Sequence, residues 1–368
     1  MSTIIFETAV IQSAASKASR VAPTKGSAFD KSAGIVLEVQ PDEDYPAIIK
    51  ATDTQTFYME WLNAIEAEGP AESWRLPSDA LDLILQKMPV GSGCQVKMER
   101  VPEGVKITAG SKRGRLNVMR MDEYPTMLPF DSTNLVDAPG FIEKISQVEW
   151  AADPSGAAPL GYVLLDGKVA RATDRHRLAV STLEFECDDP ILVQARTLTR
   201  VLGKNTNPRI GVDNGMLHLM PDDHTQIRTS TYEGSYPDTS RLMDRDKPNT
   251  IRCRKKDLID IMEAALTVAG NERFPSMDLH IGREEIAASL ANKSYGLFGD
   301  VLSVPGQADH KRMMITITPK LLMDAINQAP DEVIVFGYDI TNLRKPLYVN
   351  GGSGFEAWVA LRGGDEKS

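Results

Sequence analysis

The chain has 368 residues, a length that predicts two or three domains at roughly 100 to 200 residues each, and we expect three. Hydrophobic residues make up 42% of it and charged residues 25%, which excludes a disordered or fibrous protein. The formal net charge of -10 argues against a protein that coats DNA through many Lys and Arg contacts, although an acidic protein can still carry a local basic face.

The first predicted elements are a helix at 6–22, a second helix that begins at Pro77 and Ser78, and a strand meander over 94–121. Glu7 interrupts the first apolar run and no basic leader precedes it, so we expect no signal peptide. No run approaches the roughly 18 uncharged apolar residues of a membrane span, and we expect a cytoplasmic protein. The meander predicts turns at 102–104 and 113–114, and the basic stretch 111–115 fits a hairpin turn better than a nucleic-acid patch.

The same order of elements recurs twice more along the chain. Helices are expected at about 140–150 and 192–203, then strands around a turn at 213–215; the third copy has helices at about 256–269 and 318–330, then strands within 331–362. An Ala-Thr-Asp tripeptide begins at Ala51 and again at Ala172, 121 positions later. A Tyr-Pro pair at Tyr124 recurs at Tyr236, 112 positions later.

A repeat of this kind decides the architecture before any single motif does. Two helices and many antiparallel strands in about 120 residues predict an α+β fold with helices on one side of the sheets. We expect three similar domains, at 1–133, 134–246 and 247–368. A closed ring suits such units better than a solenoid, which needs shorter repeats, or a propeller, which needs no helices.

Three units of this kind, the motif ATDRHRLAV at 172–180, the Tyr-Pro pairs and the motif GNERF at 270–274 together resemble the bacterial sliding clamps, the β subunits of DNA polymerase III. The match is best over 74–130, 171–243, 258–274 and 314–348. The motifs look most like the actinobacterial branch, and a phage-encoded clamp is an open alternative. The resemblance implies three DNA-clamp domains per chain in a head-to-tail homodimeric ring, with helices lining the hole and antiparallel sheets outside.

The resemblance also implies a function without catalysis, cofactor or metal. Such a ring encircles duplex DNA regardless of sequence, and it tethers the replicative DNA polymerase, the clamp loader and other proteins that carry a clamp-binding motif. Because the ring is held by topology, an acidic protein can serve DNA without tight phosphate contacts.

A pocket for a short apolar partner peptide is part of the resemblance. Matching positions are Leu160, Thr173, Arg175, His176, Arg177, Leu178, Pro237, Arg241, Leu242, Val359 and Leu361. The leucines at 160, 178 and 242 would form an apolar cup, with arginine stems covering it and their heads on the polar groups of the peptide. The chain departs from the family at Arg175, where Gly is often found, and at its C-terminal run, which lacks the Pro and both Met of the usual ending.

Two other interpretations of the ATDRHRLAV stretch stay open. Asp174 and His176 could form the acid/base or metal pair of a hydrolase, but no companion nucleophile, third ligand or nucleotide-binding motif accompanies them. Alternatively, His176 belongs to an ordinary structural turn. Cys94, Cys187 and Cys253 are far apart and have no metal-ligand spacing. A ring or scaffold that binds peptides without encircling DNA is a further alternative function.

The resemblance also indicates where DNA and a second subunit would bind. Basic residues on the predicted lining helices or next to them are Lys17, Arg20, Lys25, Lys87, Arg196, Arg200, Lys204 and Lys320, for which a solvated helix face is the simpler explanation. The subunit seam matches Leu116 and Val118 on an edge strand of the first domain and Val268 and Ala269 in the third, although a place in the core is an equal alternative. An open apolar edge strand would invite aggregation unless it were paired.

Overall fold

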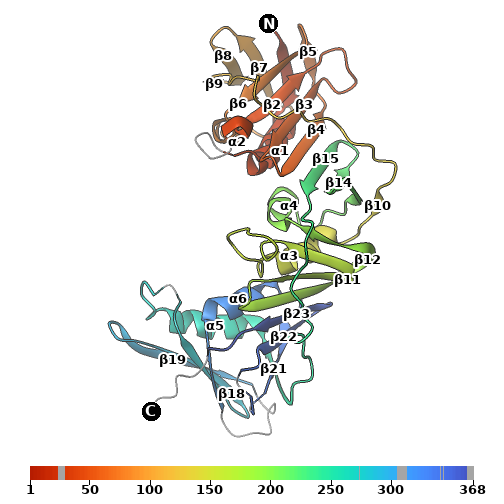
Figure 1. Cartoon of the computed structure of the whole chain (residues 1–368). Helices are drawn as coiled ribbons and strands as arrows, with labels where there is room; N and C mark the ends of the chain where they lie inside the picture. Colours follow the sequence, from red (N-terminus) through yellow and green to blue (C-terminus); the bar gives the residue numbers. More distant parts are fainter. Residues whose placement is uncertain (24–29, 273, 305–312, 340, 343, 363–368) are drawn as a thin grey trace. The chain divides into compact units, whose positions relative to one another are not determined.

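The computed structural model describes residues 1–23, 30–272, 274–304, 313–339, 341–342 and 344–362. Its contacts divide the chain into two compact units, each described here by itself (Figure 1). Unit 1 comprises Met1–Ile142 and Arg196–Thr231, and unit 2 comprises Glu143–Ala195 and Tyr232–Ser368. No helix among the described residues is long and apolar enough to cross a membrane.

Each of the six predicted helices is present in the described chain. They are α1 (Thr8–Val21), α2 (Ser78–Gln86), α3 (Phe141–Glu149), α4 (Ala195–Val201), α5 (Lys255–Leu266) and α6 (Pro319–Gln328), with a short 3-10 turn at Asp30–Ser32. Helix α6 begins at a proline preceded by Thr318 in extended conformation, as expected. Helix α1 buries Ile11, Ala14, Ala15 and Ala18, and this 3,4-spaced face of mostly small residues lets the helix approach its neighbours closely.

Two antiparallel sheets make up unit 1. The five-stranded sheet has the order β5 (Glu66–Glu68), β1 (Thr3–Glu7), β7 (Gln95–Val101), β8 (Gly104–Ala109) and β9 (Lys112–Leu116). The eight-stranded sheet has the order β10 (Val136–Asp137), β13 (Arg209–Asp213), β14 (Met216–Asp222), β15 (Thr225–Ser230), β4 (Thr56–Leu62), β3 (Ala47–Thr52), β2 (Ile35–Val39) and β6 (Glu72–Leu76).

One predicted turn of the meander is wrong. Arg113 and Gly114 lie inside β9, and the chain reverses three residues earlier, at Gly110 and Ser111. Gly110 has a φ of 57°, and a glycine with positive φ at the first loop position suits the twist of a two-residue hairpin. The basic stretch is therefore an edge strand rather than a turn. The turns predicted at 102–104 and 213–215 are confirmed.

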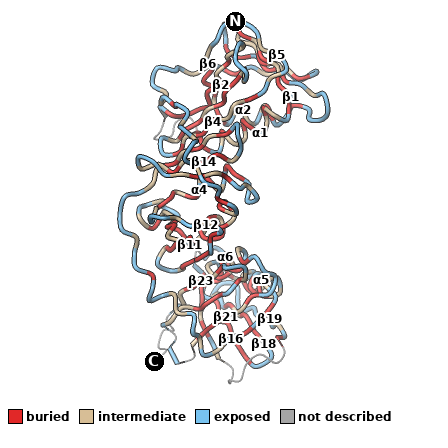
Figure 2. The backbone as a smooth tube through the Cα atoms, turned by 90° about the vertical axis from the view of Figure 1, so that its right-hand side faces the viewer, coloured by how far each residue is buried: buried red, intermediate tan, exposed pale blue. Residues whose placement is uncertain are grey.

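Unit 2 also contains two antiparallel sheets. The six-stranded sheet has the order β11 (Val163–Thr173), β12 (Arg177–Val193), β23 (Phe355–Val359), β22 (Leu347–Gly352), β21 (Val333–Tyr338) and β16 (Asn249–Arg254). The four-stranded sheet has the order β19 (Gly296–Ser303), β18 (Glu285–Asn292), β17 (Met277–Ile281) and β20 (Met313–Ile317). Buried residues concentrate in strands and helices, while the connecting loops are mostly exposed (Figure 2).

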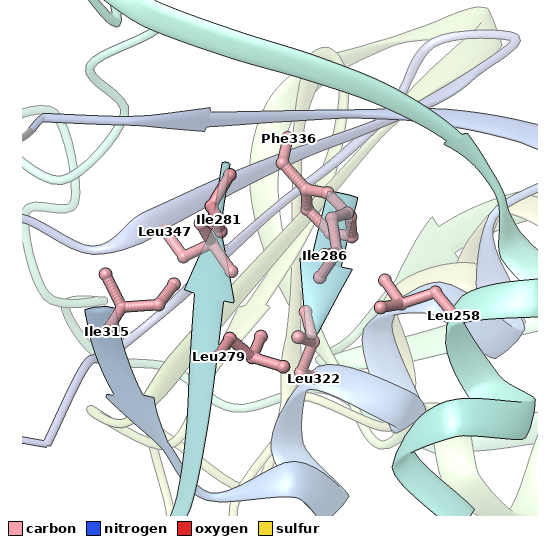
Figure 3. Close-up of a pocket in the computed structure, with 8 residues that line it drawn as sticks. All are labelled: Leu258, Leu279, Ile281, Ile286, Ile315, Leu322, Phe336 and Leu347. Carbon is pink, nitrogen blue, oxygen red and sulfur yellow. The ribbon is translucent and has the colours of Figure 1, made fainter. Parts of the chain in front are cut away.

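The core of unit 2 joins helices α5 and α6 to both of its sheets. Apolar side chains from all four converge in Figure 3: Leu258, Leu279, Ile281, Ile286, Ile315, Leu322, Phe336 and Leu347. The cavity among them measures about 10 Å³, roughly the least space that a single water molecule needs. Because its lining is wholly apolar, it is a packing gap and not a ligand site.

The strand orders contain the internal repeat. The pairing of β15 with β4 in unit 1 corresponds to the pairing of β23 with β12 in unit 2, and each of these two pairings is here called a joint. On one side of the joint, the series β15-β14-β13-β10 corresponds to β23-β22-β21-β16. On the other side, β4-β3 corresponds to β12-β11. The strands β9-β8-β7-β1 of the five-stranded sheet correspond to β15-β14-β13-β10. The strands β19-β18-β17-β20 of the four-stranded sheet correspond to β4-β3-β2-β6. Strand β9 is thus the counterpart of β15 and β23, and β19 is the counterpart of β4 and β12. In the described part of the chain, neither β9 nor β19 has a neighbour on its outer side.

The shared sheets explain why the contacts give two compact units. Strand β15 pairs with β4 and β12 pairs with β23, so each of these sheets combines strands from two successive repeats. The repeats themselves begin at β1, β10 and β16. Domain boundaries at 133 and 246 therefore remain a prediction.

Candidate peptide surface and open sheet edges

The ATDRHRLAV stretch forms a tight turn between β11 and β12. The Thr173 hydroxyl donates to the carbonyl of Arg177 (2.6 Å) and accepts the N–H of Arg175 (3.1 Å). One carboxylate oxygen of Asp174 accepts the N–H groups of His176 (2.9 Å) and Arg177 (3.0 Å). Arg175 has a φ of 77°, which the turn requires at this position. Thr and Asp are thus needed to satisfy the backbone of the turn.

The first repeat builds the same turn between β3 and β4. The Thr52 hydroxyl donates to the carbonyl of Thr56 (2.8 Å) and accepts the N–H of Thr54 (2.9 Å). Asp53 accepts the N–H groups of Gln55 (3.0 Å) and Thr56 (2.6 Å). Thr54 has a φ of 78°, one degree from that of Arg175. The repeat predicted from the two tripeptides is confirmed down to individual hydrogen bonds.

This geometry does not support acid/base chemistry at Asp174 and His176. Both carboxylate oxygens of Asp174 are engaged, one by backbone N–H groups and the other by the Arg177 guanidinium at 3.0 Å. His176 is exposed, and its carbonyl accepts the N–H of Ala360 (2.8 Å). Among the described residues, no group of three His, Cys, Asp or Glu side chains could hold a metal ion.

Arg177 joins the turn to two helical regions of unit 2. Its guanidinium pairs with Asp324 of α6 at 2.8 Å and lies 5.0 Å from the ring centroid of Trp150, just beyond α3. With Asp174 it has three internal partners. That its head also meets a partner peptide stays a prediction.

An apolar group, here called the Trp358 cluster, lies beside the turn. It consists of Leu178, Val180, Tyr348 and Trp358, against which Val169 and Met243 pack. The rings of Tyr348 and Trp358 are 5.3 Å apart. Leu178 is only 1% exposed, so it lies in the floor of the surface rather than at its rim.

The other predicted pocket residues differ in exposure. Leu160 and Val359 are buried and Leu361 is half-buried, whereas Leu242 is 41% exposed. Pro237 and Arg241 are exposed, as is Arg175 on the turn. Leu242 is therefore the predicted anchor most accessible to a ligand.

Residues 236–247 cross beside the Trp358 cluster. They are here called the second strap, because residues 124–130 form a corresponding first strap in unit 1. At its start, the hydroxyl of Tyr236 accepts the N–H of Thr173 (2.9 Å), and burial raises the pKa of Tyr236 to about 12, so it stays neutral. Further on, the carbonyl of Asp244 accepts the indole N–H of Trp358 (3.1 Å). Pro237, Arg241 and Leu242 of this segment were predicted from the sequence, but the hydrogen bonds that hold the segment in place were not.

Glu356 of β23 fastens the far end of the second strap. It accepts hydrogen bonds from the Arg245 guanidinium (2.6 to 2.9 Å) and from the Tyr348 hydroxyl (2.6 Å). Burial is the largest single effect on the Glu356 carboxyl and raises its pKa, but the bonds from Arg245 and Tyr348 together outweigh it and leave the pKa lowered. Glu356 therefore stays ionised.

The chain is similar in sequence to bacterial β sliding clamps. No family model matches the chain. It is 24% identical over 249 residues to the β sliding clamp of Streptococcus pneumoniae, a match covering 64% of this chain and 65% of that protein, which is less than two thirds of its length. The β sliding clamp of Haemophilus influenzae is 22% identical over 303 residues, covering 77% of this chain and 80% of that protein.

Solved structures agree over nearly the whole chain. The DNA polymerase III β subunit of Thermotoga maritima superposes with a TM-score of 0.82 at 19% identity, covering 98% of this chain and 99% of that one. The chain has the sliding-clamp fold. A Pseudomonas aeruginosa sliding clamp bound to griselimycin superposes with a TM-score of 0.78 at 14% identity, covering 98% of this chain and 99% of that one. An actinobacterial or phage origin stays a prediction.

Most of the predicted DNA-binding residues are exposed on helices or directly after them. The Arg20 guanidinium donates to the carbonyl of Arg200 (2.7 Å), which brings the C-terminal ends of α1 and α4 together in unit 1. Exposed positions are Arg20, Lys87, Arg196, Arg200, Lys204 and, in unit 2, Lys320. Lys17 instead pairs with Glu60 at 3.0 Å. Lys25 lies outside the described residues.

The predicted seam residues lie on or near β9 and near β19, the two edge strands whose counterparts are paired within the described chain. Leu116 is buried at the end of β9, and Val118 is half-buried beyond it. Val268 is half-buried after α5, and Ala269 is buried. Leu116 thus lies on the edge strand β9, as expected, whereas Val118, Val268 and Ala269 lie outside β9 and β19.

The exposed apolar side chains beside these edges were not among the predicted site residues. Leu297 is 74% exposed and Val301 56% exposed on β19, and Phe298 is exposed between them. Leu83 on α2 and Val90 after it are exposed too, on the helix that packs beside β9. Two apolar pairs, Leu297-Phe298 and Val301-Leu302, flank Gly299 and Asp300, and their lack of strict alternation was the available signal.

Proposed function

We propose that the chain is a sliding clamp, a DNA polymerase processivity factor that acts as a head-to-tail homodimeric ring. It encircles duplex DNA without reading sequence, and it tethers the replicative polymerase, the clamp loader and other motif-bearing proteins. It is not an enzyme and works in the cytoplasm, where bacterial replication takes place. The observation that carries the proposal is that β9 and β19 lack, among the described residues, the neighbour that their counterparts β15, β23, β4 and β12 have.

The repeat assigns a partner to each open edge. Within the chain, a β4-type strand pairs antiparallel with a β15-type strand twice, as β4 with β15 and as β12 with β23. Strand β19 is the third strand of the first type and β9 the third of the second type. They belong to different units, and pairing β19 with the β9 of a second copy continues the series. Two copies joined twice in this head-to-tail manner close into a ring.

The side chains of the two edges favour this pairing over self-association. Strand β9 exposes Lys112, Arg113 and Arg115, which would repel a second β9. Strand β19 exposes apolar side chains and Asp300. Open edges with this composition are a liability for a monomer, and a partner strand removes it.

The helices supply the proposed DNA-facing surface. The chain carries a net charge of -10, yet Arg20 and Arg200 meet at the C-terminal ends of α1 and α4, and exposed Arg196 lies one turn before Arg200 on α4. A local basic face of this kind attracts the phosphate backbone, while the small number of cations keeps contacts weak enough for sliding. A scaffold that never encloses DNA would not need this clustering.

The surface around the Trp358 cluster is the proposed docking site for partner peptides. Exposed Leu242 supplies an apolar anchor contact, and exposed Arg175 and Arg241 supply positive charge at its rim. A short peptide with an apolar residue and a neighbouring acidic or polar group fits this combination.

Small-angle X-ray scattering of the purified chain tests the ring. We expect a hollow particle of twice the 40.4 kDa chain mass. A compact monomer at high protein concentration would contradict the ring and leave the peptide-binding scaffold as the better function.

A further inference from the structure

Strands β3 and β4 of unit 1 repeat the part of the Trp358 surface that β11 and β12 form. Superposing the two Ala-Thr-Asp turns along the sequence places Phe57 on Leu178, Met59 on Val180 and Ile48 on Val169. In unit 1, Ile48, Met59 and Met127 form a buried apolar group against which Phe57, Trp61 and Tyr124 pack. We call this group the Met59 cluster. Both clusters are apolar and share the contribution of one strand pair, β3–β4 or β11–β12. The positions of Tyr348 and Trp358 are taken in unit 1 by His218 and Arg228, which are not part of the Met59 cluster.

A segment of the chain itself covers the Met59 cluster. Residues 124–130, here called the first strap, begin with the first Tyr-Pro pair, as the second strap begins with the other. The Arg75 guanidinium lies 5.0 Å from the ring centroid of Tyr124, at the start of the strap. Met127 inserts into the cluster and is 4% exposed, and its carbonyl lies 3.5 Å from the Lys50 ammonium, which donates to it.

The far ends of the two straps are fastened from equivalent positions. Gln226 of β15 is paired with Met59 across the joint, and Glu356 of β23 is paired with Val180 across the other joint. Gln226 accepts the backbone N–H of Phe130 (3.0 Å) and donates to its carbonyl (3.2 Å). An amide that bonds both backbone groups of one residue holds an extended peptide by its main chain, which is how a docked peptide is recognised.

The two surfaces differ in how completely the strap fills them. Met127 belongs to the buried cluster of unit 1, whereas Met243 of the second strap packs against its cluster while only half-buried, next to exposed Leu242. The first surface is closed by the chain, and the other retains accessible apolar area.

We propose that the Met59 cluster is a second peptide-docking surface, occupied in the resting chain by the first strap with Met127 as the bound anchor. Its ligand chemistry follows from the occupant: an extended peptide with Met or Leu in the cluster and an aromatic residue three positions later, as in Met127 and Phe130. This inference rests on the proposed function, in that the Trp358 surface serves as the template of a docking site.

The test uses the full-length chain and a synthetic peptide with the sequence of residues 124–130 that carries a photo-crosslinker. Met127→Ser removes the internal anchor, and we expect it to bind one more equivalent of peptide per chain than the unmodified protein, with new crosslinks in 56–62 by mass spectrometry. The matched control is Met121→Ser, because Met121 is an exposed methionine just before the first strap. It should bind no additional peptide.

A second variant covers the case in which Met127→Ser does not fold. Gln226→Ala removes only the fastening of Phe130, and we expect the same new crosslinks at higher peptide concentration. Folded variants, judged by circular dichroism, that gain no peptide or crosslink it elsewhere would overturn the proposal. Crosslinks in 177–180 or 355–359 report the Trp358 surface separately, so failure of the proposed function is distinguishable.

Discussion

Single residues of the Ala-Thr-Asp turns explain why this tripeptide recurs. Each turn must satisfy several backbone groups within five residues, and a Thr hydroxyl with an Asp carboxylate does so twice with the same bonds. The residue directly after the Asp has a positive φ in both turns, but its side chain is not needed for these hydrogen bonds. It is Thr54 in one turn and Arg175 in the other. Structural need, rather than catalysis, accounts for Asp174.

Thr173→Val should destabilise the protein by about 1 to 3 kcal/mol, because it leaves the Arg177 carbonyl and the Arg175 N–H without their buried partner. Denaturant unfolding measures the change. Thr126→Val replaces an exposed threonine and should cost less than about 0.5 kcal/mol. Equal effects of the two changes would show that the turn bonds do not matter.

Glu356→Gln should weaken the second strap in a pH-dependent way. The folded-state pKa of Glu356 is lowered from 4.5, so the carboxylate contributes stability above that value and loses it as pH falls through the folded pKa. We expect a deficit of about 1 kcal/mol at pH 7, since Arg245 is partly exposed, and a shrinking deficit below pH 4.5. Unfolding curves of both proteins across pH measure it, with Glu233→Gln as an exposed control. A deficit independent of pH would refute the ion-pair account.

Leu242→Asp should weaken binding of a polymerase-derived peptide by at least about tenfold, because it places a charge where the apolar anchor would rest. Leu178 is unsuitable for this test. Its side chain is only 1% exposed, so a charged side chain at this position would disrupt the core. Titration by fluorescence anisotropy gives the affinity, and Leu128→Asp, at an exposed leucine of the first strap, is the control. Unchanged affinity would move the docking site away from Leu242.

At the scale of elements, strand order carries more information than strand sequence. Strands β4, β12 and β19 occupy equivalent places, yet only β19 lacks an outer neighbour in the described chain. Leu297 and Val301 are four residues apart on this strand and so share a face. Edges of this kind are either blocked or paired in stable proteins.

Leu297→Lys with Val301→Lys should give monomers, because the added charges would face the basic side chains of β9 in a second copy. Analytical ultracentrifugation reports the mass. Met314→Lys with Val333→Lys changes two exposed apolar residues on other strands and should leave the dimer intact. A dimer that survives the change in β19 would place the seam elsewhere.

At the scale of the whole molecule, the distribution of charge decides between a clamp and a peptide scaffold. The net charge of -10 opposes DNA binding, so any retention on DNA depends on where the cations lie. Cations on helices α1 and α4 are the ones that a ring would turn toward the duplex.

Charge reversal of Arg20, Arg200 and Lys204 to Glu should therefore abolish salt-sensitive retention on circular duplex DNA while the dimer persists. Gel filtration with nicked plasmid measures retention. Reversal of Lys168, Arg283 and Lys293, exposed residues outside the helices, changes the net charge equally and should have little effect. Equal loss in both triple variants would favour a general charge effect over a DNA-facing surface.

The sequence by itself determined the parts of this protein that depend on neighbours along the chain. Helical spacing located all six helices, and the tripeptides at Ala51 and Ala172 located the repeat, because capping, periodicity and turn chemistry act within a few residues. One turn was misplaced by three residues, since the basic composition of β9 concealed an edge strand. Only the tertiary structure decided which strands join across repeats, that Leu178 lies in the floor and that Met127 fills a surface of its own chain. These outcomes depend on pairings between residues tens to hundreds of positions apart, which no local pattern specifies.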